Sequence, residues 1–233
     1  MKKLLTLIAI AVISLSVNAQ KDVTTFLGIP VDGTKAEMFQ KLKAKGFTPT
    51  SYDKDILEGE FNGTNVYVHI VTNRDKVYRI MVTDANTTNE SNIKIRFNNL
   101  CRQFEKNGKY GSFSEDQTIA EDEDISYEMS AKNKRYQASY YQKLEWMLHP
   151  EKMDTLYMTQ LLNERLLTKF SQADIDNPTE EIKNEISETS IELAFELTTK
   201  KSVWFMISKL NYDEYYIVMY YDNEYNHADG EDL

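Results

Sequence analysis

The sequence predicts an α+β protein with a mainly antiparallel sheet of meanders and hairpins and with helices packed on one side. Residues 56–84 support this prediction, because they contain stretches of alternating apolar and polar residues separated by turn residues. Residues 34–46 and 87–107 have the caps and apolar spacing of amphipathic helices. Two further strand-like stretches, 202–210 and 215–222, follow near the C-terminus. These elements fit two related helix-plus-meander lobes, residues 20–112 and 113–233, or one continuous sheet.

Residues 1–19 have the pattern of a secretory signal peptide. Two lysines precede an apolar run at residues 4–13, and the segment ends in Val-Asn-Ala. The run is too short to span a bilayer, so we expect cleavage between Ala19 and Gln20 and no stable membrane insertion afterwards. No cysteine follows the run to accept a lipid anchor. We therefore expect a soluble exported protein, periplasmic or extracellular.

The mature chain is acidic. The formal net charge is −10, and removal of the two lysines in the signal peptide makes it −12. Affinity for phosphate backbones comes from clustered Lys and Arg, so the sequence predicts no nucleic-acid partner. Cys101 is the only cysteine, which excludes an internal disulfide and leaves packing to stabilise the fold.

The first helix is predicted to begin after Thr34. Thr34 and Glu37 have the spacing of a capping box, and Gly46 stands where a left-handed residue ends the helix. A phosphate-binding loop would need several glycines at the helix start together with a Lys or Ser that reaches the anion, and only Gly33 is near. The stretch therefore favours a packed, capped helix.

A three-stranded meander follows this helix. The Asn62-Gly63 dipeptide between residues 56–61 and 65–73 is a strong hairpin signal. The third strand, residues 76–85, comes after a turn at residues 73–75. Alternation along it predicts one face formed by Val77, Arg79 and Met81, and another formed by Tyr78, Ile80 and Val82.

The second helix is predicted to open with a capping box from Thr87 to Glu90 and to close at Asn107-Gly108. Its apolar stripe comprises Ile93, Phe97, Leu100 and Phe104. Cys101 adjoins this stripe. A catalytic thiol would need a nearby base and a lowered pKa, so we interpret Cys101 as a packing residue.

Residues 111–124 are polar and end in four consecutive carboxylates, which marks a candidate boundary between the lobes. We interpret the acidic run as a solvated loop rather than a calcium site, because it lacks the spacing of an EF-hand loop. The cluster of Asp174, Asp176, Glu180 and Glu181 is more typical of a helix start than of a metal cage. The sequence thus predicts no metal site and no cofactor.

The second half is predicted to contain a hairpin formed by residues 124–131 and 135–142, then helices at residues 156–170 and 179–198. The final hairpin, joined at residues 211–214, is apolar on both faces. It is either central in a sheet covered on both sides or exposes one face to a partner.

Aromatic residues concentrate near the C-terminus. Tyr and Trp favour half-buried interfaces, so a sugar or a protein could stack there. The alternative is ordinary packing of core and edge strands. The residues of this possible partner surface are Trp204, Tyr216, Tyr220 and Tyr225.

Several segments carry a resemblance to known proteins. The signal ending in Ala-Gln, the opening FLGIPVDGTKAEM, the middle NTTNESNIKIRFNNLCRQF and the ending YYDNEYNHADGEDL together resemble a group of uncharacterised exported proteins from Bacteroidetes. The order of turn, capped helix and antiparallel strands is also similar to exported lobes of the β-lactamase-inhibitor-protein type, although the disulfides of that inhibitor are missing here. This second resemblance implies a sheet presented to a partner, and hence binding rather than catalysis.

Asp154-Thr155-Leu156 resembles the O-glycosylation acceptor of exported Bacteroidetes proteins, which implies a sugar on Thr155. Three Asn-X-Ser/Thr sites, at residues 62, 86 and 89, matter only in a cell with the machinery to use them.

Two classes of function remain open from the sequence. The first is an exported binding, interaction or envelope accessory protein with an unknown protein or glycan partner. The second is a carboxylate-based hydrolase, for example one acting on glycans, since such cleavage needs only two suitably separated acids. The sequence contains no His-based triad, zinc motif or nucleotide loop that would favour an enzyme.

Overall fold

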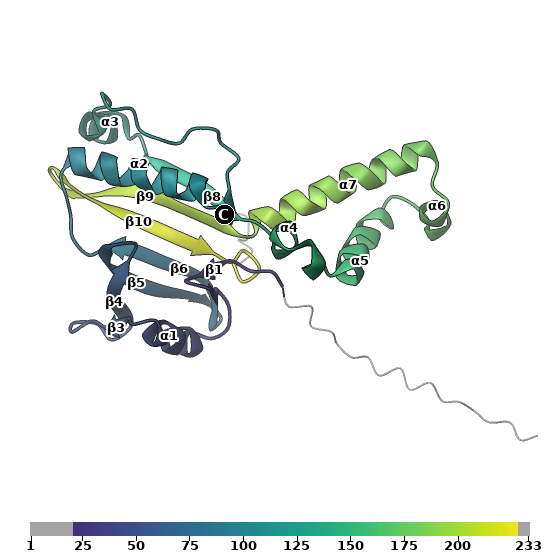
Figure 1. Ribbon diagram of the computed structural model, residues 1–233, viewed down its shortest axis with the longest axis horizontal. Coiled ribbons are helices and arrows are strands. Elements are labelled where there is room, and N and C mark those ends of the chain that lie inside the picture. The colour runs from purple at the N-terminus through teal and green to yellow at the C-terminus, as the bar shows by residue number, and fades with distance from the viewer. Residues whose placement is uncertain (1–20, 228–233) are drawn as a thin grey trace, which may run out of the picture.

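The computed structural model describes residues 21–227 and confirms the α+β fold (Figure 1). Within these residues, seven α-helices accompany an eight-stranded antiparallel sheet and a two-stranded hairpin. The predicted signal peptide and its cleavage site lie outside the described residues.

The first half of the chain forms a short hairpin, one helix and a four-stranded meander. In order these are β1 (Thr25–Phe26), β2 (Ile29–Pro30), α1 (Lys35–Ala44), β3 (Thr48–Pro49), β4 (Ile56–Phe61), β5 (Thr64–Asn73) and β6 (Lys76–Asp84). The predicted capping box of Thr34 and Glu37 is present at the start of α1. The predicted hairpin turn at Asn62-Gly63 joins β4 to β5, and both residues have the positive φ that a two-residue hairpin turn of type I′ requires.

The second half contains four strands of the sheet, helices α2 and α3, and a helical insertion between its second and third strands. Its elements are α2 (Glu90–Lys106), β7 (Tyr110–Gly111), α3 (Ile125–Lys132), β8 (Gln137–Gln142), α4 (Glu145–Leu148), a 3₁₀ turn (Pro150–Lys152), α5 (Thr155–Leu166), α6 (Gln172–Asp176), α7 (Glu180–Thr199), β9 (Ser202–Asn211) and β10 (Glu214–Asp222).

The sheet is continuous through both halves, with strand order β3-β4-β5-β6-β10-β9-β8-β7. The last strand of each half, β6 and β10, pair with each other at the centre. The division into lobes at residues 112 and 113 stays a prediction.

The main core lies on one face of this sheet. Alternate residues of β5, such as Val68, face Met38 and Leu42 of α1, while Phe205 of β9 faces Phe97 of α2. All belong to one buried cluster, so α1 and α2 cover the same face. The final hairpin is therefore central and is covered by helices on one side.

The insertion between β8 and β9 projects to one side of the sheet as an arm of helices α5, α6 and α7 (Figure 1). A second, small apolar cluster holds it at its base, where Leu144 packs with Leu193 and Leu197 of α7. No helix within residues 21–227 is both long and apolar enough to cross a bilayer.

Three local predictions were wrong. The strand predicted at residues 124–131 is replaced by helix α3, because the Asp124 carboxylate accepts a hydrogen bond from the Tyr127 amide and caps the helix. Helix α2 is capped by Asn89 and not from Thr87, since Thr88 exchanges two backbone hydrogen bonds with Tyr215.

The third concerns the faces of β6. Val77 is buried together with Ile80 and Val82, whereas Arg79 and Met81 lie on the opposite face. An irregularity in the β5–β6 register shifts the alternation between Val77 and Arg79.

Candidate functional site

The sheet face opposite α1 and α2, which we call the open face, carries a row of large side chains. Strand register places His69, Met81, Tyr220 and Trp204 side by side across β5, β6, β10 and β9. Each is partly exposed, and none belongs to the buried core cluster. The neighbouring row contains Tyr67, Thr83, Val218 and Met206. The open face is thus apolar and aromatic at its centre.

An interlocked cluster fixes the middle of the open face. The Trp204 and Tyr220 rings stack with centroids 4.0 Å apart, and the Arg79 guanidinium lies 4.8 Å from the Tyr220 centroid. Arg79 donates two hydrogen bonds to the Asp222 carboxylate, at 2.5 and 2.8 Å. Trp204 Nε1 donates a third, at 2.9 Å. The aromatic and charged groups therefore hold one another in place.

The environment shifts the pKa values of three groups on this face. Hydrogen bonding to Asp222 raises the pKa of Arg79, which keeps the guanidinium charged. Burial lowers the pKa of His69 and raises the pKa of Tyr220, so both side chains favour their neutral forms. The Arg79–Asp222 pair is the charged feature of a surface that is otherwise apolar at its centre.

Aromatic side chains also stand at both ends of the open face. At one end Tyr52 packs edge-on against Tyr67. At the other, Tyr141 stacks on Phe113 and its ring lies where a side chain on Gly111 would stand. Gly111 therefore allows Tyr141 to cross the sheet edge.

Three of the four residues predicted to form a partner surface lie on this face. Tyr216 lies on the same side of β10 as Tyr220, and Tyr220 is paired with Trp204 of β9. Tyr225 does not join them. Its ring packs against the apolar cluster at the base of the arm, with Lys21 and Lys200 over it, and burial raises its pKa to about 12.

Thr155, the predicted glycosylation site, is the exposed first residue of α5. Asp154 caps this helix by accepting a hydrogen bond from the Tyr157 amide. The sugar on Thr155 stays a prediction.

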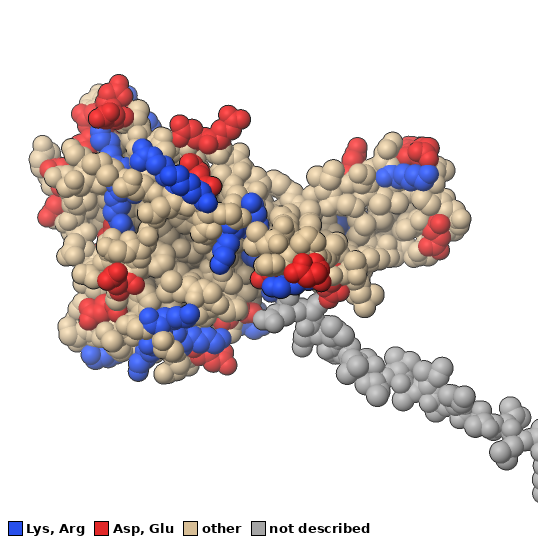
Figure 2. All heavy atoms as spheres, viewed as in Figure 1, with Lys and Arg blue, Asp and Glu red and all other residues tan. Residues whose placement is uncertain are grey.

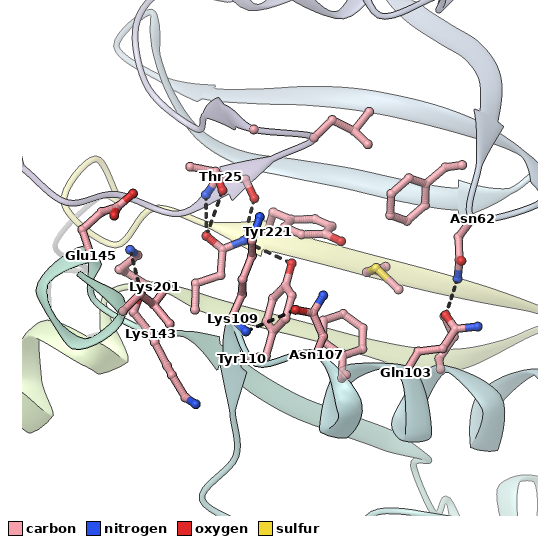
Figure 3. A pocket seen from close by; sticks show the side chains of 18 of the residues that line it. Thr25, Asn62, Gln103, Asn107, Lys109, Tyr110, Lys143, Glu145, Lys201 and Tyr221 are labelled. Carbon is pink, nitrogen blue, oxygen red and sulfur yellow. Dashed lines mark hydrogen bonds between the residues drawn. The ribbon is translucent and has the colours of Figure 1, made fainter.

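A cleft of about 810 Å³ opens on the helix-covered side of the sheet. Its walls are the C-terminal half of α2, the β1–β2 hairpin, the β4–β5 turn, residues 109 and 110 at the start of β7, and the end of β8 with α4 (Figure 3). Met219 and Tyr221 of β10 contribute to its lining. Figure 2 shows a hollow in the middle of the face in view, with Lys and Arg side chains near its edge.

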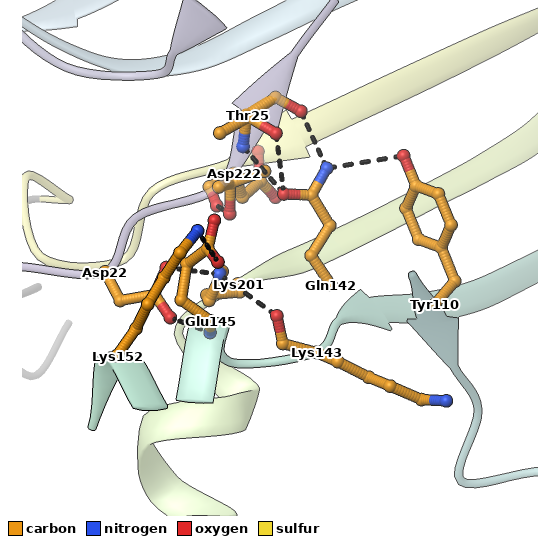
Figure 4. A network of polar contacts seen from close by, with 10 residues as sticks. Asp22, Thr25, Tyr110, Gln142, Lys143, Glu145, Lys152, Lys201 and Asp222 are labelled. Carbon is orange, nitrogen blue, oxygen red and sulfur yellow. Dashed lines mark hydrogen bonds and ion pairs between the residues drawn. The ribbon is translucent and has the colours of Figure 1, made fainter. Parts of the chain in front are cut away.

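A buried ion pair supports one wall of the cleft (Figure 4). Lys201, only 3% exposed, donates to the Asp22 carboxylate and to the Lys143 carbonyl oxygen. The other Asp22 oxygen accepts from the Glu145 amide at 2.6 Å. This network ties the N-terminal segment to α4 and to the start of β9.

Gln142 fixes the neighbouring wall. Its amide pairs with Thr25, accepting from the Thr25 amide at 2.7 Å and donating to the Thr25 carbonyl at 2.6 Å. It also donates to the Tyr110 hydroxyl at 3.3 Å (Figure 4). Burial raises the pKa of Tyr110, which keeps this hydroxyl neutral.

The sequence also singled out Cys101 and the acidic clusters. Cys101 is buried in the main core, and burial raises the pKa of its thiol to about 11. A thiol with a raised pKa is a poor nucleophile at neutral pH, in agreement with the packing interpretation. Within the described part of the chain, no group of three or more His, Cys, Asp or Glu is placed to hold a metal ion.

Sequence reasoning missed Arg79 and the whole cleft. Arg79 meets Asp222 only because β6 pairs with β10, two strands that are far apart in the sequence. The cleft is likewise built from segments between Asp22 and Tyr221. No local sequence motif predicts the Arg79–Asp222 pair or the cleft.

Comparisons with known proteins add no assignment: no family model, no curated protein and no solved structure matches the chain.

Proposed function

We propose that this is an exported binding protein, periplasmic or extracellular, which docks a protein partner on the open face. The observation that carries the proposal is the preorganised cluster of Trp204, Tyr220 and Arg79 at the centre of an uncovered sheet face. Trp, Tyr and Arg are the residues most enriched at the energetic centres of protein interfaces. The signal-peptide pattern of residues 1–19 supports the export part of the proposal.

The stacking geometry favours a protein over a glycan. A sugar binds to an aromatic residue through an open ring face, and Trp204 and Tyr220 each use one face against the other. Arg79 lies close to both rings. The apolar second row, with Met206 and Val218, suits the apolar centre of a protein interface.

Affinity capture with four baits tests the proposal. The mature chain, Tyr220→Ala, Trp204→Ala and the control Tyr212→Ala would each be exposed to envelope and medium fractions of the source organism. Tyr212 is 88% exposed in the β9–β10 turn, so it is a matched tyrosine away from the cluster. We expect a protein that the mature chain and Tyr212→Ala retain and that the other two variants lose.

Circular dichroism of each bait shows whether it is folded, so that loss of binding can be told apart from unfolding. If Trp204→Ala fails to fold, Trp204→Phe replaces it. Equal retention by all baits would contradict the proposal. Retention of a glycan alone, abolished by Tyr220→Ala, would replace the protein partner with a saccharide.

The alternative, a carboxylate-based hydrolase, has less support. Such an enzyme needs a general acid with a raised pKa beside a second carboxylate. Asp22, the most enclosed carboxylate of the cleft, is occupied by Lys201 and the Glu145 amide. Among the described residues, every carboxyl group whose pKa is shifted has a lowered pKa, which is the wrong direction for a general acid. These groups are Glu37, Asp116, Glu123, Asp174 and Glu196, and none of them lines the cleft.

A further inference from the structure

The cleft lies on the opposite side of the sheet from the open face, so a ligand there leaves the Trp204–Tyr220 cluster accessible. Met219 and Tyr221 of β10 line the cleft, while the alternate residue Tyr220 points to the open face. Its volume of about 810 Å³ falls in the range typical of small-molecule sites. The cleft is therefore large enough to hold a ligand of its own.

Most charged side chains of the cleft offer no charge to a ligand. Lys201 pairs with Asp22, and Glu145 pairs with Lys152 (Figure 4). The Lys143 side chain starts at the same wall but runs away from the cleft (Figures 3 and 4). This wall therefore attracts neither an anion nor a cation.

Two charged side chains remain in the lining, one of each sign. Lys109 and Glu60 have no ion-pair partner among the described residues. They come from different walls, since Glu60 belongs to β4 and Lys109 directly precedes β7. Their charges offset each other, so the cleft as a whole favours an uncharged ligand.

Three side-chain amides in the lining have unused hydrogen-bonding groups. Asn62 donates to the Gln103 oxygen at 2.7 Å (Figure 3), which leaves the Asn62 oxygen and the Gln103 nitrogen without a protein partner. The Asn107 oxygen accepts from the Lys109 backbone amide at 3.1 Å, which leaves the Asn107 nitrogen. The cleft thus presents both donors and acceptors, and a hydroxyl group can bind either kind.

Two partly exposed aromatic rings add apolar surface. Phe61 of β4 meets Phe26 and Tyr221 at interplanar angles of 50° and 85°, and Tyr110 of β7 meets Phe104 at 78°. No ring is stacked parallel on Phe61 or Tyr110, and both line the cleft. They leave apolar surface against which the C–H groups of a sugar can pack.

The backbone around the cleft does not favour a peptide. An extended peptide binds by pairing its main chain with an unpaired strand edge. The amide and carbonyl of Thr25 are both bonded to Gln142, and the Lys143 amide donates to the Lys109 carbonyl at 2.9 Å. Recognition therefore falls to the side-chain amides, which suit a ligand rich in hydroxyl groups.

We propose that the cleft binds a short uncharged oligosaccharide. Its hydroxyl groups bind the amide nitrogens of Gln103 and Asn107 and the side-chain oxygen of Asn62. Its C–H groups cover Phe61 and Tyr110.

An array of immobilised oligosaccharides, probed with the labelled mature chain, tests this inference. The array carries short neutral oligosaccharides of hexoses and N-acetylhexosamines, together with counterparts that contain uronate or sulfate groups. We expect the chain to bind neutral members and to need no charged group. Calorimetric titration with the neutral oligosaccharide that binds best then gives the dissociation constant.

The variant Gln103→Ala/Asn107→Ala is expected to weaken this binding about tenfold or more, because two hydrogen-bonding amides are lost. The matched control is Asn92→Ala/Asn99→Ala, since both are exposed amide residues of α2 outside the cleft lining. The control should bind as the unmodified chain does, and so should Tyr220→Ala. Circular dichroism shows whether each variant is folded, and Gln103→Ala alone replaces the first variant if that variant unfolds.

Three results would overturn the inference: no binding to any oligosaccharide on the array, binding to charged members only, or an unchanged affinity in the cleft variant. Binding that is lost in Tyr220→Ala and kept in the cleft variant would place the sugar on the open face instead. Capture of a protein partner by the open face does not depend on any residue of the cleft, so the two proposals are tested separately.

Discussion

At the scale of single residues, Asp222 organises the centre of the molecule. Its carboxylate accepts hydrogen bonds from Arg79 of β6 and Trp204 of β9, and its carbonyl oxygen accepts from Thr24. The residue is only 3% exposed. A buried carboxylate needs such partners, because an unpaired buried charge is strongly destabilising.

We therefore expect Asp222→Ala to lower the free energy of unfolding by about 3–5 kcal/mol, because the half-buried Arg79 guanidinium loses its carboxylate partner. Urea titration followed by circular dichroism measures the change. The matched control is Asp55→Ala, which removes a surface pair with Lys35 and should cost less than about 1 kcal/mol. Equal losses in the two variants would show that the Asp222 network does not stabilise the fold.

At the scale of elements, the arm depends on a small number of contacts. Helices α5 and α7 meet through the cluster around Leu193 and Leu197 and through a shared ion group. In that group Glu196 pairs with Arg165 and with Lys200. Protonation of Glu196 therefore weakens the contact between α5 and the end of α7.

Hydrogen bonds from Arg165, and then from Lys200, lower the pKa of Glu196 below its usual value. Because the folded pKa is the lower one, the stabilisation is complete above the unfolded pKa and is lost as the pH falls through the folded pKa. The pairs are over a third exposed on the carboxylate side, so we expect a contribution below about 1 kcal/mol.

Trp146, which packs against the arm cluster, reports this change by fluorescence in a Trp204→Phe background. We expect the thermal unfolding midpoint of the arm to decrease as the pH is lowered from 6 to about 3. The variant Glu196→Gln should show a smaller decrease over the same pH range. A pH dependence identical in the two proteins would exclude the role of Glu196.

The elements that the sequence predicted correctly are those fixed by neighbours along the chain. Asn62-Gly63 sets the β4–β5 turn, and Thr34 with Glu37 sets the start of α1. The α3 helix was missed because Asp124, its cap, stands in an acidic run that resembles a loop. Trp204 and Tyr220 lie next to each other because the register of the β9–β10 hairpin pairs them, whereas Arg79 reaches them only through the pairing of β6 with β10.

At the scale of the whole molecule, one large core spans the sheet and a separate small cluster holds the arm. Because few buried contacts connect the arm to the sheet, the arm can unfold locally while the sheet stays folded. The backbone amides of the central strands exchange with solvent only when the whole molecule unfolds.

Native-state hydrogen exchange should therefore show two levels of protection. We expect amides of β5, β6 and β10 to exchange with the global free energy of unfolding, and amides of α5 and α7 to exchange at a lower one. Leu193→Ala should lower protection in the arm and leave the central strands nearly unchanged, because it opens a cavity in the small cluster alone. Equal protection of arm and sheet would contradict this separation.

The pairing of β6 with β10 also sets the order of events as the chain is made. Synthesis proceeds from the N-terminus, so Thr83 emerges long before Val218, its partner in the sheet. Until then the edge of β6 has no neighbour, and an unpaired edge invites pairing with other chains. A nascent or truncated chain that stops before β10 should thus be prone to aggregation. The two halves of the sheet can pair only after β10, the last strand, has been synthesised.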